Sequence, residues 1–164
     1  MNSLCVALLC ALATGPVQTN EAYVGYGVGV FNDADSYIGQ MKVAEVGYRY
    51  FLLDGIYWQN KIGYWGDASN DKTRSSSGYG ASGLGMELSL QPLELRSSVS
   101  LAMVTTPDSQ LGSAFPQFNE ELYAGLRDRM GDGFGFQYEH ISCGPFCSPN
   151  LGRDFIILQL SRKW

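Results

Sequence analysis

The sequence has few charged residues, one histidine and no apolar segment long enough for a membrane-spanning helix. Only 16% of the 164 residues are Asp, Glu, Lys or Arg, and the net charge of −5 arises without a block of like charge. This composition excludes the basic surface of a nucleic-acid-binding domain. One histidine, and a cysteine pair without further ligands, imply no metal site and no organic cofactor.

The longest apolar run lies at the N-terminus, over Leu4–Ala13. It is too short to cross a bilayer but suits the core of a signal peptide, and Ala11-Leu12-Ala13 fits a cleavage site. We therefore predict a signal peptide over residues 1–13, cleaved near residues 13–19, and one domain over residues 20–164. A disordered or buried N-terminal segment, or a lipoprotein signal ending at Cys10, is the alternative.

Two cysteines remain after cleavage, Cys143 and Cys147. An oxidising periplasm permits a disulfide between them, and their spacing within one loop makes it feasible. The sequence leaves their redox state open.

The rest of the chain contains eight segments in which apolar and polar residues alternate with a period of two, as in β-strands. Each has the length that a tilted strand needs to cross a membrane. The predicted strands are Tyr23–Phe31, Met41–Leu52, Ile56–Trp65, Gly78–Leu90, Leu93–Val104, Glu120–Arg129, Gly133–Ser142 and Asp154–Trp164.

One face of each predicted strand is apolar, and the other carries glycines and charges of both signs. Such a polar face suits a narrow barrel lumen filled by side chains. Structural ion pairs are expected there among Glu45, Arg49, Glu94, Arg96, Glu121 and Arg127. A soluble β-sandwich or binding module would also alternate, and it stays an alternative.

The connections alternate between short and long. Three are only two or three residues long, such as Gln91-Pro92, whereas those between them have nine to fifteen. Short periplasmic turns and long external loops are typical of bacterial outer-membrane barrels. We predict an eight-stranded antiparallel up-and-down transmembrane β-barrel in the outer membrane, with both termini periplasmic.

The histidine, His140, lies two residues before Ser142, so both side chains share one face of a strand. They continue the apolar, outward parity of Phe134, Phe136 and Tyr138. Asp154 has the outward parity of the neighbouring last strand. Serine, histidine and carboxylate are the groups of a nucleophilic hydrolase, and polar groups facing lipid are candidates for function.

The run from His140-Ile141-Ser142 through Pro149-Asn150-Leu151-Gly152 to Asp154 resembles the lipid A 3-O-deacylase (PagL) family. That family carries His-x-Ser on the penultimate strand, Asn-x-Gly in the following loop and an acid on the last strand. The resemblance implies Ser142 as nucleophile, His140 as base and Asp154 as orienting acid. It also implies Asn150 near the oxyanion. Apart from the resemblance, backbone donors in the loop after Ser142, such as that of Gly144, are candidates for binding a developing oxyanion.

Two positions depart from the family pattern. Cys143-Gly144-Pro145 follows the serine where members commonly have Asn-Ala-Gly, and the acid is Asp where they have Glu. Proline also removes one backbone donor from this loop.

The resemblance implies a serine esterase that hydrolyses the 3-position acyl ester of lipid A, or lipopolysaccharide, in the outer leaflet, without metal or cofactor. The alternatives are a non-catalytic barrel acting in adhesion or membrane stability, and an esterase of phospholipids. The oligomeric state is open, with a homodimer among the options.

Several other residues carry expectations of their own. We expect Glu139 to face the lumen. We expect solvation near an outer loop for Lys61, Lys72 and Arg74. Anchoring at the membrane interfaces is expected of the tryptophans Trp58, Trp65 and Trp164.

Overall fold

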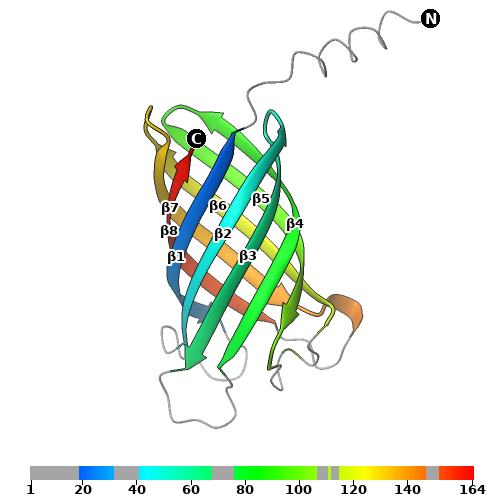
Figure 1. Ribbon diagram of the computed structural model, residues 1–164. Coiled ribbons are helices and arrows are strands. Elements are labelled where there is room, and N and C mark those ends of the chain that lie inside the picture. The colour runs from blue at the N-terminus through cyan, green and yellow to red at the C-terminus, as the bar shows by residue number, and fades with distance from the viewer. Residues whose placement is uncertain (1–18, 32–40, 68–75, 107–110, 112–114, 147–151) are drawn as a thin grey trace, which may run out of the picture.

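The computed structural model describes residues 19–31, 41–67, 76–106, 111, 115–146 and 152–164. The predicted barrel is confirmed: eight antiparallel strands pair in chain order, and β8 pairs with β1 to close the sheet (Figure 1). The strands are β1 (Asn20–Phe31), β2 (Met41–Leu53), β3 (Ile56–Asp67), β4 (Ser77–Leu90), β5 (Leu93–Val104), β6 (Gln117–Arg127), β7 (Asp132–Ser142) and β8 (Arg153–Lys163). Within these residues, no helix is long and apolar enough to span a bilayer.

The predicted strand limits are close to the observed ones, and the clearest difference lies at β6. This strand begins at Gln117, three residues earlier than its apolar alternation suggests. Gln117 and Phe118 pair with Ala102 and Leu101 of β5. Pairing with the neighbouring strand, rather than alternation within the segment, therefore sets where β6 starts.

The three short turns and the C-terminus lie at the same end of the barrel (Figure 1). Gly55 and Gly131 adopt positive φ values of 73° and 92° in two of these turns, a conformation that favours glycine. The seam also closes at this end, where Asn20 and Trp164 exchange two backbone hydrogen bonds of 2.9 Å. The strand ends that the long connections join lie at the opposite end of the barrel, which we call the loop end (Figure 1).

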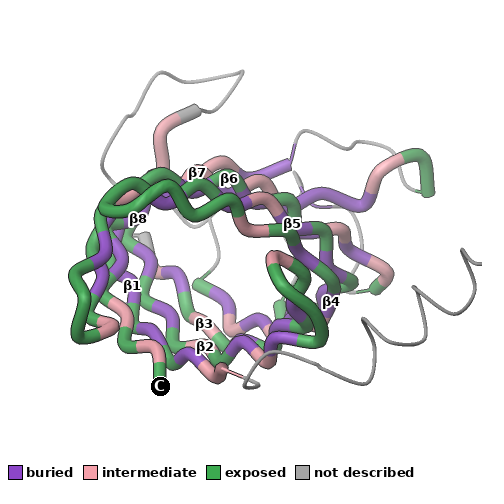
Figure 2. Tube along the Cα trace, turned by 90° about the horizontal axis from the view of Figure 1, so that it is seen from above, coloured by how far each residue is buried: buried purple, intermediate pink, exposed green. Residues whose placement is uncertain are grey.

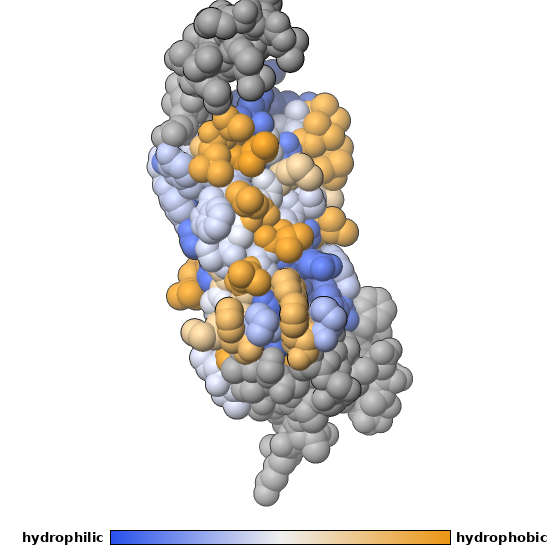
Figure 3. Space-filling view, turned by 90° about the vertical axis from the view of Figure 1, so that its right-hand side faces the viewer, coloured by the Kyte–Doolittle hydropathy of each residue, from blue (hydrophilic) through white to orange (hydrophobic). Residues whose placement is uncertain are grey.

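Burial alternates along the strands, so exposed residues face outward and buried residues face the lumen (Figure 2). The exposed set is dominated by apolar side chains, and Figure 3 shows them spread over one side of the wall. A wall of this kind is stable in contact with hydrocarbon, because the closed sheet satisfies its own backbone groups.

Charged residues fill the lumen and neutralise one another. Glu21 accepts hydrogen bonds from Arg49 and Arg96, at 2.9 and 2.8 Å, and Arg127 pairs with Glu94 at 3.0 Å. Toward the loop end the lumen is filled by an apolar cluster instead, which includes Trp65, Tyr79, Ile141 and Phe155. The lumen is therefore a packed, nearly neutral core.

Two predictions about single residues are wrong. Lys61 is fully buried in the lumen and contacts three carboxylates, from Glu45 at 3.1 Å, Glu121 at 2.6 Å and Glu139 at 2.9 Å. Trp65 is also buried, so it is no interface anchor. Both lie on the inward parity of β3. The predictions for Lys72 and Arg74 fall outside the described residues.

Replacing Lys61 with methionine is expected to lower the free energy of unfolding by about 3 kcal/mol or more. Three buried carboxylates would lose their common cation, and an uncompensated buried charge is costly. Lys42→Met is the matched control, because Lys42 is exposed on β2, and it should change stability by less than about 0.5 kcal/mol. Urea unfolding in detergent micelles measures both values. Equal stability of the two variants would contradict this role of Lys61.

Candidate active site

His140 and Asp154 meet on the outer wall. They are direct cross-strand neighbours in the β7–β8 register, and His140 Nδ1 lies 2.9 Å from Asp154 Oδ1. Their side chains are 29% and 15% exposed, so they are partly shielded from the surroundings. The contact fixes one ring nitrogen against a carboxylate and leaves Nε2 as the nitrogen able to take a proton.

Tyr138 also binds Asp154, a contact that the sequence analysis missed. Its hydroxyl donates a hydrogen bond to Oδ1, the same oxygen that faces the imidazole. The outward parity of Tyr138, two residues before His140, was the available signal. Two groups from β7 thus hold the Asp154 carboxylate, and Tyr138 is a positioning residue for the imidazole.

Ser142 follows on the same face of β7 and is only 9% exposed. Its cross-strand neighbour on β6 is Phe118, whose ring stacks on Phe146 at 5.8 Å between centroids. In the described part of the chain, the serine hydroxyl makes no hydrogen bond to His140. Catalytic hydrogen bonds in unliganded enzymes are often long and tighten when substrate binds.

The turn after Ser142 carries two further predicted site residues. Cys143 is buried and disulfide-bonded, and Gly144, with a φ of 55°, starts the short 3-10 helix η1 (Gly144–Phe146). The predicted disulfide partner Cys147 and the predicted oxyanion residue Asn150 lie outside the described residues. The Cys143–Cys147 pairing and the oxyanion role of Asn150 therefore stay predictions.

Gly152 lies against the imidazole from the other side of the loop. A Cβ atom at this position would come within 2.5 Å of His140 Cε1 and 3.1 Å of Nε2, and the φ of Gly152 is +69°. Both the close approach and the left-handed backbone require glycine here. The glycine of the Asn-x-Gly motif thus gives the ring its space.

Replacing Gly152 with alanine is expected to displace the His140 ring and to lower kcat by about 10- to 100-fold. Gly131→Ala is the matched control, because Gly131 also has a positive φ and a crowded Cβ position, yet lies in a short turn at the far end. Steady-state ester hydrolysis by the two variants, each verified as folded, gives their kcat values. The comparison separates the loss of His140 positioning from the general effect of backbone strain at a glycine. Equal losses of kcat would contradict the positioning role.

Glu120 is a second residue of the site region that the sequence analysis missed. It is exposed on β6 and is the direct cross-strand neighbour of His140, on the side opposite Asp154. Glu120 lies two residues before the outward Leu122 on β6, so the alternation in the sequence already indicated that its side chain faces outward. Cross-strand register therefore aligns the outward residues Leu84, Val99, Glu120, His140 and Asp154 in one row across β4 to β8.

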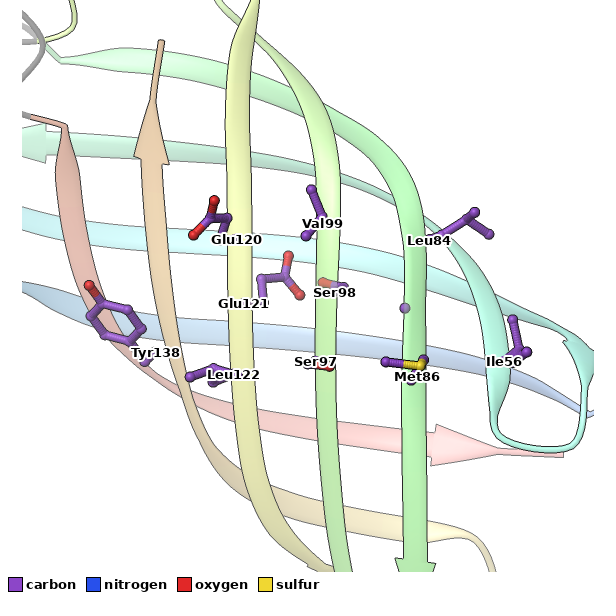
Figure 4. Close-up of a pocket in the computed structure, with 11 residues that line it drawn as sticks. Ile56, Leu84, Met86, Ser97, Ser98, Val99, Glu120, Glu121, Leu122 and Tyr138 are labelled. Carbon is purple, nitrogen blue, oxygen red and sulfur yellow. The ribbon is translucent and has the colours of Figure 1, made fainter. Parts of the chain in front are cut away.

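A groove of about 530 Å³ runs over the outer wall from this row across β4, β5 and β6. Most of its lining surface is apolar. Figure 4 shows Glu120 and Leu122 on β6, between Val99 on β5 and Tyr138. The groove falls within the size range of small-molecule sites and ends beside the His140–Asp154 pair.

A family model described as "Lipid A 3-O-deacylase (PagL)" matches residues 43–163. This range covers most of the chain and contains His140, Ser142 and Asp154. The chain belongs to the PagL family. The family and the barrel fold together place the protein in the outer membrane.

Solved structures agree with the PagL assignment at the level of the fold. The outer-membrane enzyme PagL is 18% identical with a TM-score of 0.60, covering 85% of this chain and 98% of that one. Ail, the attachment invasion locus protein of Yersinia pestis, is 8% identical with a TM-score of 0.61, covering 91% and 100%. Neisserial surface protein A is 9% identical with a TM-score of 0.59, covering 88% and 95%. A comparison with curated protein sequences gave no match.

Proposed function

We propose that this PagL-family protein is a serine esterase that removes the acyl chain from the 3-position of lipid A in the outer leaflet. The observation that carries the proposal is the His140–Asp154 hydrogen bond on the outer wall, two residues from Ser142. A base and acid pair on the membrane-facing wall favours a lipid substrate, because polar groups on this surface are costly and mark a site of function.

The His140–Asp154 pair assigns the proton transfers. Asp154, which Tyr138 holds in place, binds the Nδ1 side of the ring, so Nε2 takes the proton from the Ser142 hydroxyl as its oxygen attacks the ester carbonyl. The imidazolium then gives this proton to the 3-oxygen of the sugar, which leaves. Water next attacks the acyl-enzyme with the same base, and the 3-hydroxyacyl chain departs as a free acid.

The negatively charged oxygen that forms when Ser142 attacks the ester needs hydrogen-bond donors beside it. We propose that Asn150 lies beside it, as the resemblance implies, and that the backbone of Gly144 supplies a further donor. Pro145 carries no N–H group, so it contributes no donor. We propose that a Cys143–Cys147 disulfide braces this turn.

The depth of the site suits an ester near the headgroups of the outer leaflet. His140 and Ser142 are the last outward residues of β7, at the loop end. We propose that this end is external and that both termini are periplasmic, since the short turns and the C-terminus lie at the opposite end (Figure 1). The apolar groove beside Glu120 is positioned to receive the acyl chain.

Mass spectrometry of lipid A from cells that express the protein tests the proposal. The wild type should remove the mass of one ester-linked 3-hydroxyacyl chain, and Ser142→Ala should not. Ser89→Ala is the matched control, because Ser89 is exposed on β4 near a short turn, and it should act as the wild type does.

Each variant must first show the heat-modifiable gel mobility of a folded barrel. An unchanged lipid A profile with folded wild type rejects the proposal and favours a non-catalytic barrel. Release of acyl chains from phospholipids instead favours the phospholipid esterase.

A further inference from the structure

Glu120 places a carboxylate on the lipid-facing wall in the row of the site, and the proposed reaction does not use it. Within the described part of the chain, this carboxylate has no hydrogen-bond or ion-pair partner. A charged group facing lipid is costly and marks a site of function by default. A lumen-facing glutamate such as Glu139, in contrast, is paired with Lys61 and Asn119.

Glu120 lies beside the imidazole but cannot serve as its acid. Directly opposed residues on antiparallel strands have Cβ atoms about 4.5–5.5 Å apart. The Nδ1 atom of His140 is bonded to Asp154, and its Nε2 edge lies against Gly152. Among the residues that the structure describes, Glu120 makes no hydrogen bond or ion pair to His140, so its carboxylate is free for a substrate.

The groove limits what Glu120 can bind. An ionised carboxylate only accepts hydrogen bonds, so its partner must carry an O–H or N–H donor. The neighbouring wall is apolar: Val99 on β5 and Leu122 on β6 line the groove next to Glu120, and Leu84 follows on β4, two strands away (Figure 4). A chain that is apolar except for one hydroxyl near its carbonyl end fits this pattern.

We propose that Glu120 selects 3-hydroxyacyl chains by accepting a hydrogen bond from the hydroxyl at C3. The inference rests on the proposed function, because it assumes an acyl carbonyl at Ser142. C3 is two bonds from that carbonyl carbon. On β6, Phe118 lies directly opposite Ser142, and Glu120 lies two residues farther along toward the short turns. Glu120 also lines the groove.

The consequence is a preference between two esters that differ in one hydroxyl. A site that hydrogen-bonds a substrate hydroxyl rejects the analogue without it, because its polar group is left unpaired. Hydrogen bonds to charged groups are among the strong ones. Because Glu120 is exposed, we expect a preference of about 10-fold, at the lower end of such effects.

The experiment compares p-nitrophenyl 3-hydroxydecanoate with p-nitrophenyl decanoate in detergent micelles. The wild type should hydrolyse the hydroxylated ester with a kcat/KM about 10-fold higher. Glu120→Leu should reduce this ratio to about one, and Glu120→Gln, which keeps an acceptor without the charge, should give an intermediate ratio. Neither ester contains a sugar, so the chain hydroxyl is the donor that differs.

Leu122→Ala is the matched control on the same face of β6, and it should keep the wild-type ratio. A wild-type ratio near one would overturn the inference and point to a donor on the sugar. A Glu120→Leu variant that loses activity equally on both esters would overturn it as well, since that result indicates positioning of His140.

Failure of the proposed function is distinguishable from failure of this inference. Hydrolysis that persists in Ser142→Ala rejects Ser142 as the nucleophile, whatever the ratio of kcat/KM between the two esters. If the wild type hydrolyses neither ester, binding of the two esters to the folded Ser142→Ala variant gives the same ratio without turnover. A preference for the hydroxylated ester that Glu120→Leu removes supports the inference, and equal binding overturns it.

Discussion

Replacing His140 with glutamine is expected to lower kcat for lipid A deacylation by about 10⁴- to 10⁶-fold. Glutamine cannot take a proton from the Ser142 hydroxyl, which is a weak nucleophile without a base. The barrel should stay folded, because the imidazole lies on the outer wall and is 29% exposed. Release of 3-hydroxy fatty acid by purified protein in micelles measures the loss.

The double variant Ser142→Ala/His140→Gln sharpens this prediction. Groups that act as one catalytic unit are strongly non-additive, so the double variant should be no slower than either single variant. Losses that multiply would show that His140 and Ser142 act independently. Nearly full activity of His140→Gln would remove the base from the mechanism.

Replacing Asp154 with asparagine is expected to lower kcat by about 10⁴-fold. The amide would favour the wrong tautomer of His140 and could not stabilise the imidazolium. Asp154→Glu should retain much of the activity, because glutamate is the acid that the family pattern carries and it keeps the charge. Kinetics with the same lipid A substrate compare the variants.

Asp132→Asn is the matched control for Asp154→Asn. Asp132 also lies on the β7–β8 pair, where it bonds exposed Arg162 at 2.9 Å, but at the short-turn end. Its loss should leave kcat unchanged within error, since exposed ion pairs contribute little. If Asp154→Asn kept wild-type activity, the carboxylate would have no role in orienting the imidazole.

The barrel was predictable because membrane strands obey a strict two-residue period. Alternation located all eight strands, and the short connections located the turns. The limits of β6 were harder, because Gln117 and Phe118 are strand residues only through their pairing with β5. Local pattern carries no information about such pairing.

The His140–Asp154 pair was also predictable, since strand parity and hairpin adjacency set both residues on one surface. Tyr138, Glu120 and Gly152 were not recognised, although their parity or motif position was visible. Their roles depend on register, which places Glu120 opposite His140 and brings Gly152 against the ring. A shift of one residue in either pairing would remove these contacts.

Lys61 shows why residue type alone misleads inside a barrel. A lysine side chain suggests solvation by its charge, but Lys61 lies in the middle of β3, and its inward parity puts it among three carboxylates. The cation is retained because the lumen supplies its counter-charges.

Labelling with a fluorophosphonate probe tests the central claim most directly, because only an activated serine displaces fluoride from the reagent at a useful rate. Intact-mass and peptide analysis of the folded barrel should find one adduct, on Ser142, and none in His140→Gln or Asp154→Asn after the same exposure. An adduct on another serine, or equal labelling of Ser142 in the wild type and His140→Gln, would contradict an activated serine on the outer wall.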